Sequence, residues 1–147
     1  MKSALWLRIA SVLTFLHAVL HTIGGVFGKP HSGPEQAAVA AMQSNRFQVM
    51  GVERSYWHFY RGMGLAVGIF LLVGAIVFWQ LGSLAKTDAS RLRPILATFV
   101  AGYLAFAVCS WEYFFAPPVI AEILIAVCLA LAFLTARKTL NTNPRVI

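Results

Sequence analysis

Four long apolar segments constrain this chain more than any other feature of its sequence. They run near Ala4–Phe27, Phe59–Leu84, Ile95–Phe115 and Pro118–Ala136. Each has roughly the 20 residues that a helix needs to span a bilayer. Backbone polar groups in lipid must be satisfied internally, which leaves helices and closed barrels, and these segments lack the alternation of barrel strands. The sequence therefore predicts an all-α integral membrane protein, a four-helix up-down bundle that forms a single domain over residues 1–147.

The composition supports contact with lipid and argues against nucleic acid. Hydrophobic residues make up 59% of the 147 residues and charged residues only 12%, and the mean hydropathy is +0.74. A chain this small cannot bury so many apolar side chains in its own interior, so the surplus must face the bilayer. The net charge of +7 comes from basic residues that flank the apolar segments and form no continuous stripe, so we expect no nucleic-acid partner.

Basic residues also predict the orientation. With four spans, both termini and the connection between the second and third spans lie on one side. That side carries eight basic residues: Lys2, Arg8, Lys86, Arg91, Arg93, Arg137, Lys138 and Arg145. The other side carries four: Lys29, Arg46, Arg54 and Arg61. The positive-inside rule then predicts a multi-pass inner-membrane protein with both termini in the cytoplasm.

The two outer connections differ in length. In the long one, after the first span, Pro34 and Glu35 form a favourable first helical turn before an alanine-rich run. We expect a short extracytoplasmic helix there, between the first and second spans. The third and fourth spans meet at FFAPP with almost no loop, which predicts a tight antiparallel hairpin.

Each predicted span carries ionisable groups in its outer third. They are His17 and His21 on the first span, His58 and Arg61 at the second, Glu112 on the third and Glu122 on the fourth. An isolated charge in the bilayer costs at least ~2.5 kcal/mol, so we expect these groups to face inward and form a functional pocket. Next to Arg61, Gly64 and Gly68 form a small-xxx-small pair that allows another helix to approach closely. Trp57, Tyr60 and Trp111 add aromatic surface.

The leading hypothesis is a site for a small amphiphilic molecule, such as a quinone or a polar-headed lipid, with proton-transfer chemistry. In this hypothesis His21 and Glu112 are the catalytic residues that handle protons, and Arg61 orients an anionic or carbonyl group. The ligand-binding residues are His17, His58, Arg61, Glu122, Trp57, Tyr60 and Trp111. The sequence specifies no cofactor, does not decide whether the protein is an enzyme, and leaves open whether it forms a homo-oligomer.

Two alternatives remain open. A zinc or iron centre could use His17, His21, Glu112 and Glu122, although an H-x-x-x-H spacing without an intervening glutamate is a weak motif and Arg61 would repel a cation. A small-solute or proton transporter is the other alternative, although the polar groups lie on one side only. We assign no role to Arg8, near the cytoplasmic end, and expect Cys109 and Cys128 to be packing residues because they differ in depth.

Two stretches resemble a known group. They are LRIASVLTFLHAVLHTIGG in the first span and RFQVMGVERSYWHFYRGMGL before and within the second. Together they resemble an uncharacterised family of small bacterial four-helix membrane proteins that carries an MG-x-x-R-S-Y-W-x-F-Y-R-G block. The architecture is also similar to the broader DoxX-like class, some of whose members are linked to quinol chemistry. The residues that match are His21, Arg54, Ser55, Tyr56, Trp57, Tyr60, Arg61 and Gly62. Position 58, for which the resemblance implies an acidic residue, is histidine here.

Overall fold

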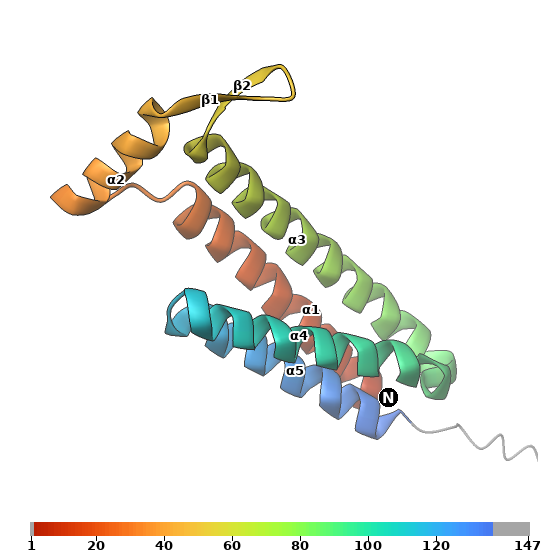
Figure 1. The fold of residues 1–147 in the computed structure, drawn as a ribbon. Helices are drawn as coiled ribbons and strands as arrows, with labels where there is room; N and C mark the ends of the chain where they lie inside the picture. The colour runs from red at the N-terminus through yellow and green to blue at the C-terminus, as the bar shows by residue number, and fades with distance from the viewer. Residues whose placement is uncertain (1, 137–147) are drawn as a thin grey trace, which may run out of the picture. The chain divides into compact units, whose positions relative to one another are not determined.

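The computed structural model describes residues 2–136, and helices make up most of this range (Figure 1). In chain order the elements are α1 (Lys2–Leu20), η1 (His21–Val26), α2 (Gly33–Ser44), β1 (Arg46–Val49), β2 (Val52–Ser55), α3 (Tyr56–Asp88), η2 (Ala89–Leu92), α4 (Arg93–Tyr113) and α5 (Ala116–Thr135). By contact the chain divides into two compact units. We call Met1–Phe15 with Val73–Ile147 the terminal unit, and Leu16–Leu72 the hairpin unit.

The predicted helical character is confirmed. Among the described residues, three continuous helical runs are long and apolar enough to cross a membrane: Lys2–Val26, Tyr56–Tyr113 and Ala116–Thr135. The second run holds both α3 and α4, joined by the short 3-10 turn η2. Three of the basic residues used for the orientation, Arg137, Lys138 and Arg145, lie outside the described range.

The terminal unit is built around one apolar core. The start of α1, the end of α3, α4 and α5 all contribute to it. Its fully buried side chains include Leu7, Phe78, Leu96, Ile125 and Leu129. One polar contact joins two of these helices inside the unit, since the Ser11 hydroxyl on α1 donates to the Ala75 carbonyl on α3 at 2.7 Å. Four helices therefore share a core in this unit.

The expected antiparallel pair of the third and fourth spans is confirmed. It is formed by α4 and α5 and belongs to the terminal unit (Figure 1). Phe114 closes α4 through a hydrogen bond from its N–H to the Ser110 carbonyl, and a proline in the first turn of α5 starts the next helix. At the far end of the pair, the Arg93 guanidinium donates to the Phe133 and Ala136 carbonyls at 3.2 and 3.4 Å. Because Arg93 begins α4 and Ala136 follows α5, this contact requires the two helices to run antiparallel.

The hairpin unit contains the expected short helix, α2. Its N-terminus is capped by Ser32, whose hydroxyl accepts a hydrogen bond from the Glu35 N–H at 3.3 Å. The Glu35 carboxylate in turn accepts from the His31 N–H at 2.7 Å, so Ser32 pairs a donor of the first helical turn and Glu35 ties the preceding residue to the helix.

The hairpin unit also contains an antiparallel β-hairpin that the sequence analysis did not predict. Strands β1 and β2 pair Val49 with Val52, and the two turn residues between them, Met50 and Gly51, have φ values of +49° and +79°. A two-residue turn of this kind favours Asn-Gly or Asp-Gly. Because Met50 occupies the first turn position, the sequence lacks the usual signal of this turn. The Phe47 ring lies 4.9 Å from that of Tyr56 and so fixes the hairpin against the start of α3.

Candidate functional site

The histidine pair lies where α1 changes from α-helical to π-helical geometry. His21 is the first residue of the π-helical turn η1, and π-helical turns are frequent at functional sites. His17 is buried, with 8% of its surface exposed, whereas His21 is half-buried. The two rings lie edge to face, with their centroids 6.5 Å apart. The expected juxtaposition of the two imidazoles is therefore present within the hairpin unit.

The backbone of α3 fixes the tautomer of His21. Its Nε2 lies 2.9 Å from the Gly64 carbonyl oxygen. A carbonyl can only accept, so Nε2 carries a proton and donates it to this bond. In the neutral imidazole, Nδ1 then keeps its lone pair and can accept a proton or a hydrogen bond from a ligand. His21 is thus held by one nitrogen and offers the other for chemistry.

Gly25 keeps the space beside this second nitrogen open. A Cβ added at Gly25 would lie 3.7 Å from Nδ1 of His21, in ordinary van der Waals contact, whereas one added at the neighbouring Gly24 would meet nothing within 4 Å. The absence of a side chain at Gly25 therefore exposes the nitrogen that the hydrogen bond to Gly64 leaves free.

The small-xxx-small pair on α3 permits the close approach that this hydrogen bond needs. A Cβ added at Gly64 would lie 2.8 Å from Cγ2 of Val26, and one added at Gly68 would lie 2.7 Å from Oγ1 of Thr22. Both distances are shorter than real Cβ atoms tolerate. The prediction of a close helix contact at Gly64 and Gly68 is confirmed, and its partner is the π-helical turn.

Arg61 lies among aromatic rings one turn before Gly64. Its guanidinium carbon is 4.8 Å from the centre of the Phe27 ring and 5.9 Å from that of Trp57. The Trp57 ring stacks on Tyr60 at 5.4 Å. Within residues 2–136 no hydrogen bond or ion pair engages the Arg61 guanidinium. Aromatic faces stabilise this cation and leave its N–H donors for a ligand.

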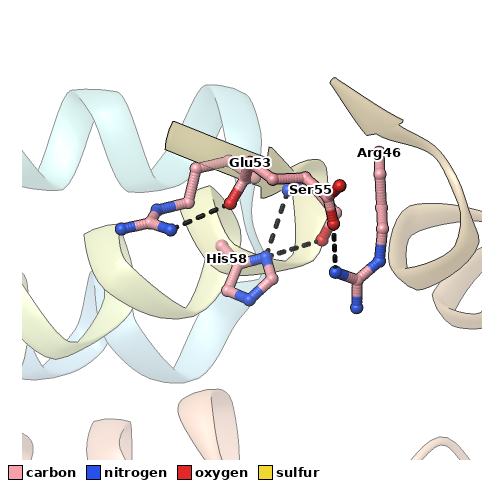
Figure 2. Close-up of polar contacts among 5 residues, drawn as sticks. Arg46, Glu53, Ser55 and His58 are labelled. Atoms are coloured by element: carbon pink, nitrogen blue, oxygen red, sulfur yellow. Dashed lines mark hydrogen bonds and ion pairs between the residues drawn. The ribbon is translucent and has the colours of Figure 1, made fainter. Parts of the chain in front are cut away.

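His58 takes part in the cap of α3 (Figure 2). Its Nδ1 accepts hydrogen bonds from the Ser55 N–H at 3.1 Å and from the Ser55 hydroxyl at 2.9 Å. Ser55 directly precedes α3, and a side chain three residues into a helix that accepts from the preceding N–H forms half of a capping box. The acidic residue that the resemblance implies at position 58 could make the same bond. The contact gives His58 a role in starting the helix.

Replacing His58 tests this role. We expect His58→Ala to lower the free energy of unfolding by about 1 kcal/mol, and His58→Glu to retain the wild-type value because a carboxylate also accepts from Ser55. Thermal unfolding in detergent measures both. Glu53→Ala is the control, since it removes only the exposed ion pair with Arg46 and should cost under about 1 kcal/mol. Equal losses for His58→Glu and His58→Ala would contradict the cap.

The two glutamates belong to the terminal unit and differ in their surroundings. Glu122 on α5 is 1% exposed, and its Oε1 accepts a hydrogen bond from the Ser110 hydroxyl on α4 at 2.8 Å. In the part of the chain that the structure describes, Oε2 of Glu122 has no hydrogen-bond partner. Glu112 and Trp111, by contrast, are exposed at the end of α4. Only Glu122 is built into a polar contact between helices.

This difference predicts unequal responses to substitution. Glu122→Gln can still accept from Ser110, so we expect it to fold normally, whereas Glu122→Ala leaves Ser110 unpaired beside a cavity and should cost roughly 2–4 kcal/mol. Glu112→Ala should change the free energy of unfolding by less than about 0.5 kcal/mol. The measurement is denaturant unfolding in detergent, and a similar loss at both positions would contradict the buried contact.

The structure thus divides the predicted site residues between the units. His17, His21, Trp57, His58, Tyr60 and Arg61 lie in the hairpin unit, and Trp111, Glu112 and Glu122 lie in the terminal unit. A single pocket that unites both sets stays a prediction. The four-residue metal centre also stays a prediction, since no three His, Cys, Asp or Glu side chains between residues 2 and 136 are placed to hold one ion.

Comparison with known proteins identifies no relative of this chain. No protein-family model, no curated protein and no solved structure matches the chain.

Sequence reasoning missed three contributors to these contacts. Nothing in the sequence distinguishes Ser110 and Thr22 as contact residues, because small hydroxyl side chains are common in apolar helices and usually bond to the backbone of their own helix. Arg8 was assigned no role, but its guanidinium packs over Trp79 and donates to Ser83. Cys128 is buried in the core as expected, whereas Cys109 is exposed and does not pack there.

Proposed function

We propose that this chain is a bacterial inner-membrane protein in which α1, α3, α4 and α5 span the bilayer up and down, with both termini in the cytoplasm. Support comes from the length and apolar composition of the helical runs and from the excess of basic residues on the side of the termini. In this arrangement α2 and the β-hairpin lie outside the cytoplasm.

The function that the geometry supports best is binding of a small amphiphilic molecule, with proton transfer at His21. The observation that carries this proposal is the fixed tautomer of His21, because the bond to the Gly64 carbonyl holds the ring and leaves Nδ1 for a ligand. The open space beside Gly25 gives access to that nitrogen.

Arg61 supplies the second element of recognition. Its guanidinium rests on Phe27 and Trp57 and has unused donors, which suit a carbonyl, phenolate or phosphate oxygen. A quinone or a polar-headed lipid combines such an oxygen with an apolar body that the surrounding aromatic and aliphatic side chains can cover. In proton transfer, the O–H bond of a bound hydroxyl breaks and an N–H bond forms at Nδ1 of His21, while Arg61 stabilises the oxyanion.

Metal binding is the second candidate, favoured by one observation. Histidine ligands commonly donate their other N–H to a backbone carbonyl, as His21 does to Gly64. A transporter has no comparable support in the contacts of the described residues. The metal and amphiphile candidates share His21 and differ in the mass of what is bound.

Native mass spectrometry of gently extracted protein tests the proposal. We expect a retained organic adduct at a stoichiometry of one, present in wild type and reduced in His21→Ala. An adduct of metal-ion mass that disappears in His21→Ala would establish the alternative. Bare wild-type protein, after reconstitution with ubiquinone or menaquinone as probes, would overturn the proposal.

A further inference from the structure

The terminal unit contains a groove that shares no residue with the histidine pair. It has a volume of about 420 Å³ and is lined by Ala4, Leu5, Arg8 and Lys86. The first three residues belong to α1 and the fourth to the last turn of α3. The groove therefore combines an apolar wall from one helix with a cation from each of two helices.

Arg8 is positioned in this groove by contacts with α3. Its guanidinium carbon lies 3.5 Å from the centre of the Trp79 ring, and its Nη2 donates to the Ser83 hydroxyl at 2.8 Å. Gly82 makes room for the side chain, since a Cβ there would lie 3.2 Å from Nε of Arg8. Within the described range, Nη1 is buried and has no hydrogen-bond partner. The contacts with Trp79 and Ser83 thus hold the guanidinium, and the hydrogen bond to Ser83 uses only one of its N–H groups.

In the described part of the chain, no carboxylate forms an ion pair with either cation. Lys86 is exposed and takes part in no hydrogen bond or ion pair among residues 2–136. The nearest acidic residue along the chain, Asp88, is already engaged, because its carboxylate lies 2.9 Å from Nε of Arg91 and accepts from Ser90 at 2.7 Å. An anion in the groove would therefore face two uncompensated positive charges.

We propose that this groove binds the phosphate headgroup of an anionic membrane lipid. A guanidinium with free donors and a nearby ammonium match a phosphate oxyanion, the first through directed hydrogen bonds and the second as a point charge. Leu5 is 59% exposed and offers an acyl chain an apolar surface next to the charges, which a free phosphate ion could not use. The proposal rests on the membrane placement proposed above, but not on the ligand of His21.

The test compares lipid retention in nanodiscs that contain equal amounts of phosphatidylglycerol and phosphatidylcholine. Native mass spectrometry after release from the nanodisc counts the lipids that stay bound. We expect wild type to retain phosphatidylglycerol preferentially, and Lys86→Gln to reduce this preference about fivefold, the effect typical of one cation near an anionic surface. Arg8→Gln should reduce it by at least as much.

Arg91→Gln is the matched control, because it removes the same charge from an arginine that pairs with Asp88 outside the groove. It should leave the preference unchanged. Arg8 packs on Trp79, so Arg8→Gln could unfold the bundle. Lys86→Gln keeps the test valid because Lys86 is exposed.

The outcomes separate the two proposals and the two sources of phosphate. If the protein inserts into nanodiscs, two results overturn the groove proposal. One is equal retention of both lipids by wild type, and the other is an equal loss of the phosphatidylglycerol preference in Lys86→Gln and Arg91→Gln. Failure to insert overturns the membrane placement itself. Displacement of phosphatidylglycerol by millimolar inorganic phosphate would show that the groove recognises phosphate without the lipid, and would also overturn it.

Discussion

Replacing His21 with alanine is expected to reduce retention of the bound amphiphile at least tenfold while the protein still folds. The reason is that Nδ1 provides the polar contact to the ligand, and loss of a charge-assisted hydrogen bond costs about 1.5–3 kcal/mol. The scaffold should survive because His21 is half-buried and makes one bond to α3, at Gly64. Retained adduct mass and quinone binding by fluorescence quenching measure the loss.

Two neighbouring glycines allow access to Nδ1 of His21 to be tested while the imidazole is kept. Gly25→Ala places a methyl group 3.7 Å from Nδ1 of His21, whereas Gly24→Ala meets nothing within 4 Å. Both changes raise helix propensity by a similar amount. We expect Gly25→Ala to weaken ligand binding severalfold and Gly24→Ala to leave it unchanged. Equal binding by the two variants would show that Nδ1 is not the contact atom.

The helices could be predicted from the sequence, because apolar length alone determines which segments can cross a bilayer. The short helix α2 was also predictable, from Pro34, Glu35 and the alanine-rich run that follows. The β-hairpin was not. Its strands are four residues each, and its turn uses Met50 at positive φ in place of the usual asparagine or aspartate. Short strands joined by an atypical turn leave almost no periodic signal.

The sequence predicted which residues belong to the candidate site, but it predicted few of the contacts that these residues make. The spacing of His17 and His21 correctly predicted that their rings lie close together, since residues four apart share a helix face. The spacing could not show that the backbone becomes π-helical at His21, or that Arg61 rests on aromatic rings. Those features depend on contacts between segments distant in the sequence, such as His21 with Gly64 and Arg61 with Phe27.

Replacing Gly68 with leucine is expected to be among the most destabilising single changes in the hairpin unit. Even a Cβ at this position would lie 2.7 Å from Oγ1 of Thr22, so a larger side chain must push the π-helical turn away from α3. Overpacking of this kind typically costs 1–3 kcal/mol or more. The same displacement would break the bond from His21 to Gly64, one turn away, so ligand retention should fall together with stability.

Gly62 and Thr22 make this prediction specific. Gly62 lies on the same helix, and a Cβ there meets nothing within 4 Å, so Gly62→Leu should be neutral or slightly stabilising. The milder Gly68→Ala should be rescued by Thr22→Ala, which removes the hydroxyl in the way, and the double variant should recover both the unfolding midpoint and ligand retention. If Gly68→Leu and Gly62→Leu unfold at the same denaturant concentration, the close contact of η1 with α3 does not exist in the protein. The proposed role of His21 would then lose its geometric basis, because the Gly64 carbonyl could not fix its tautomer.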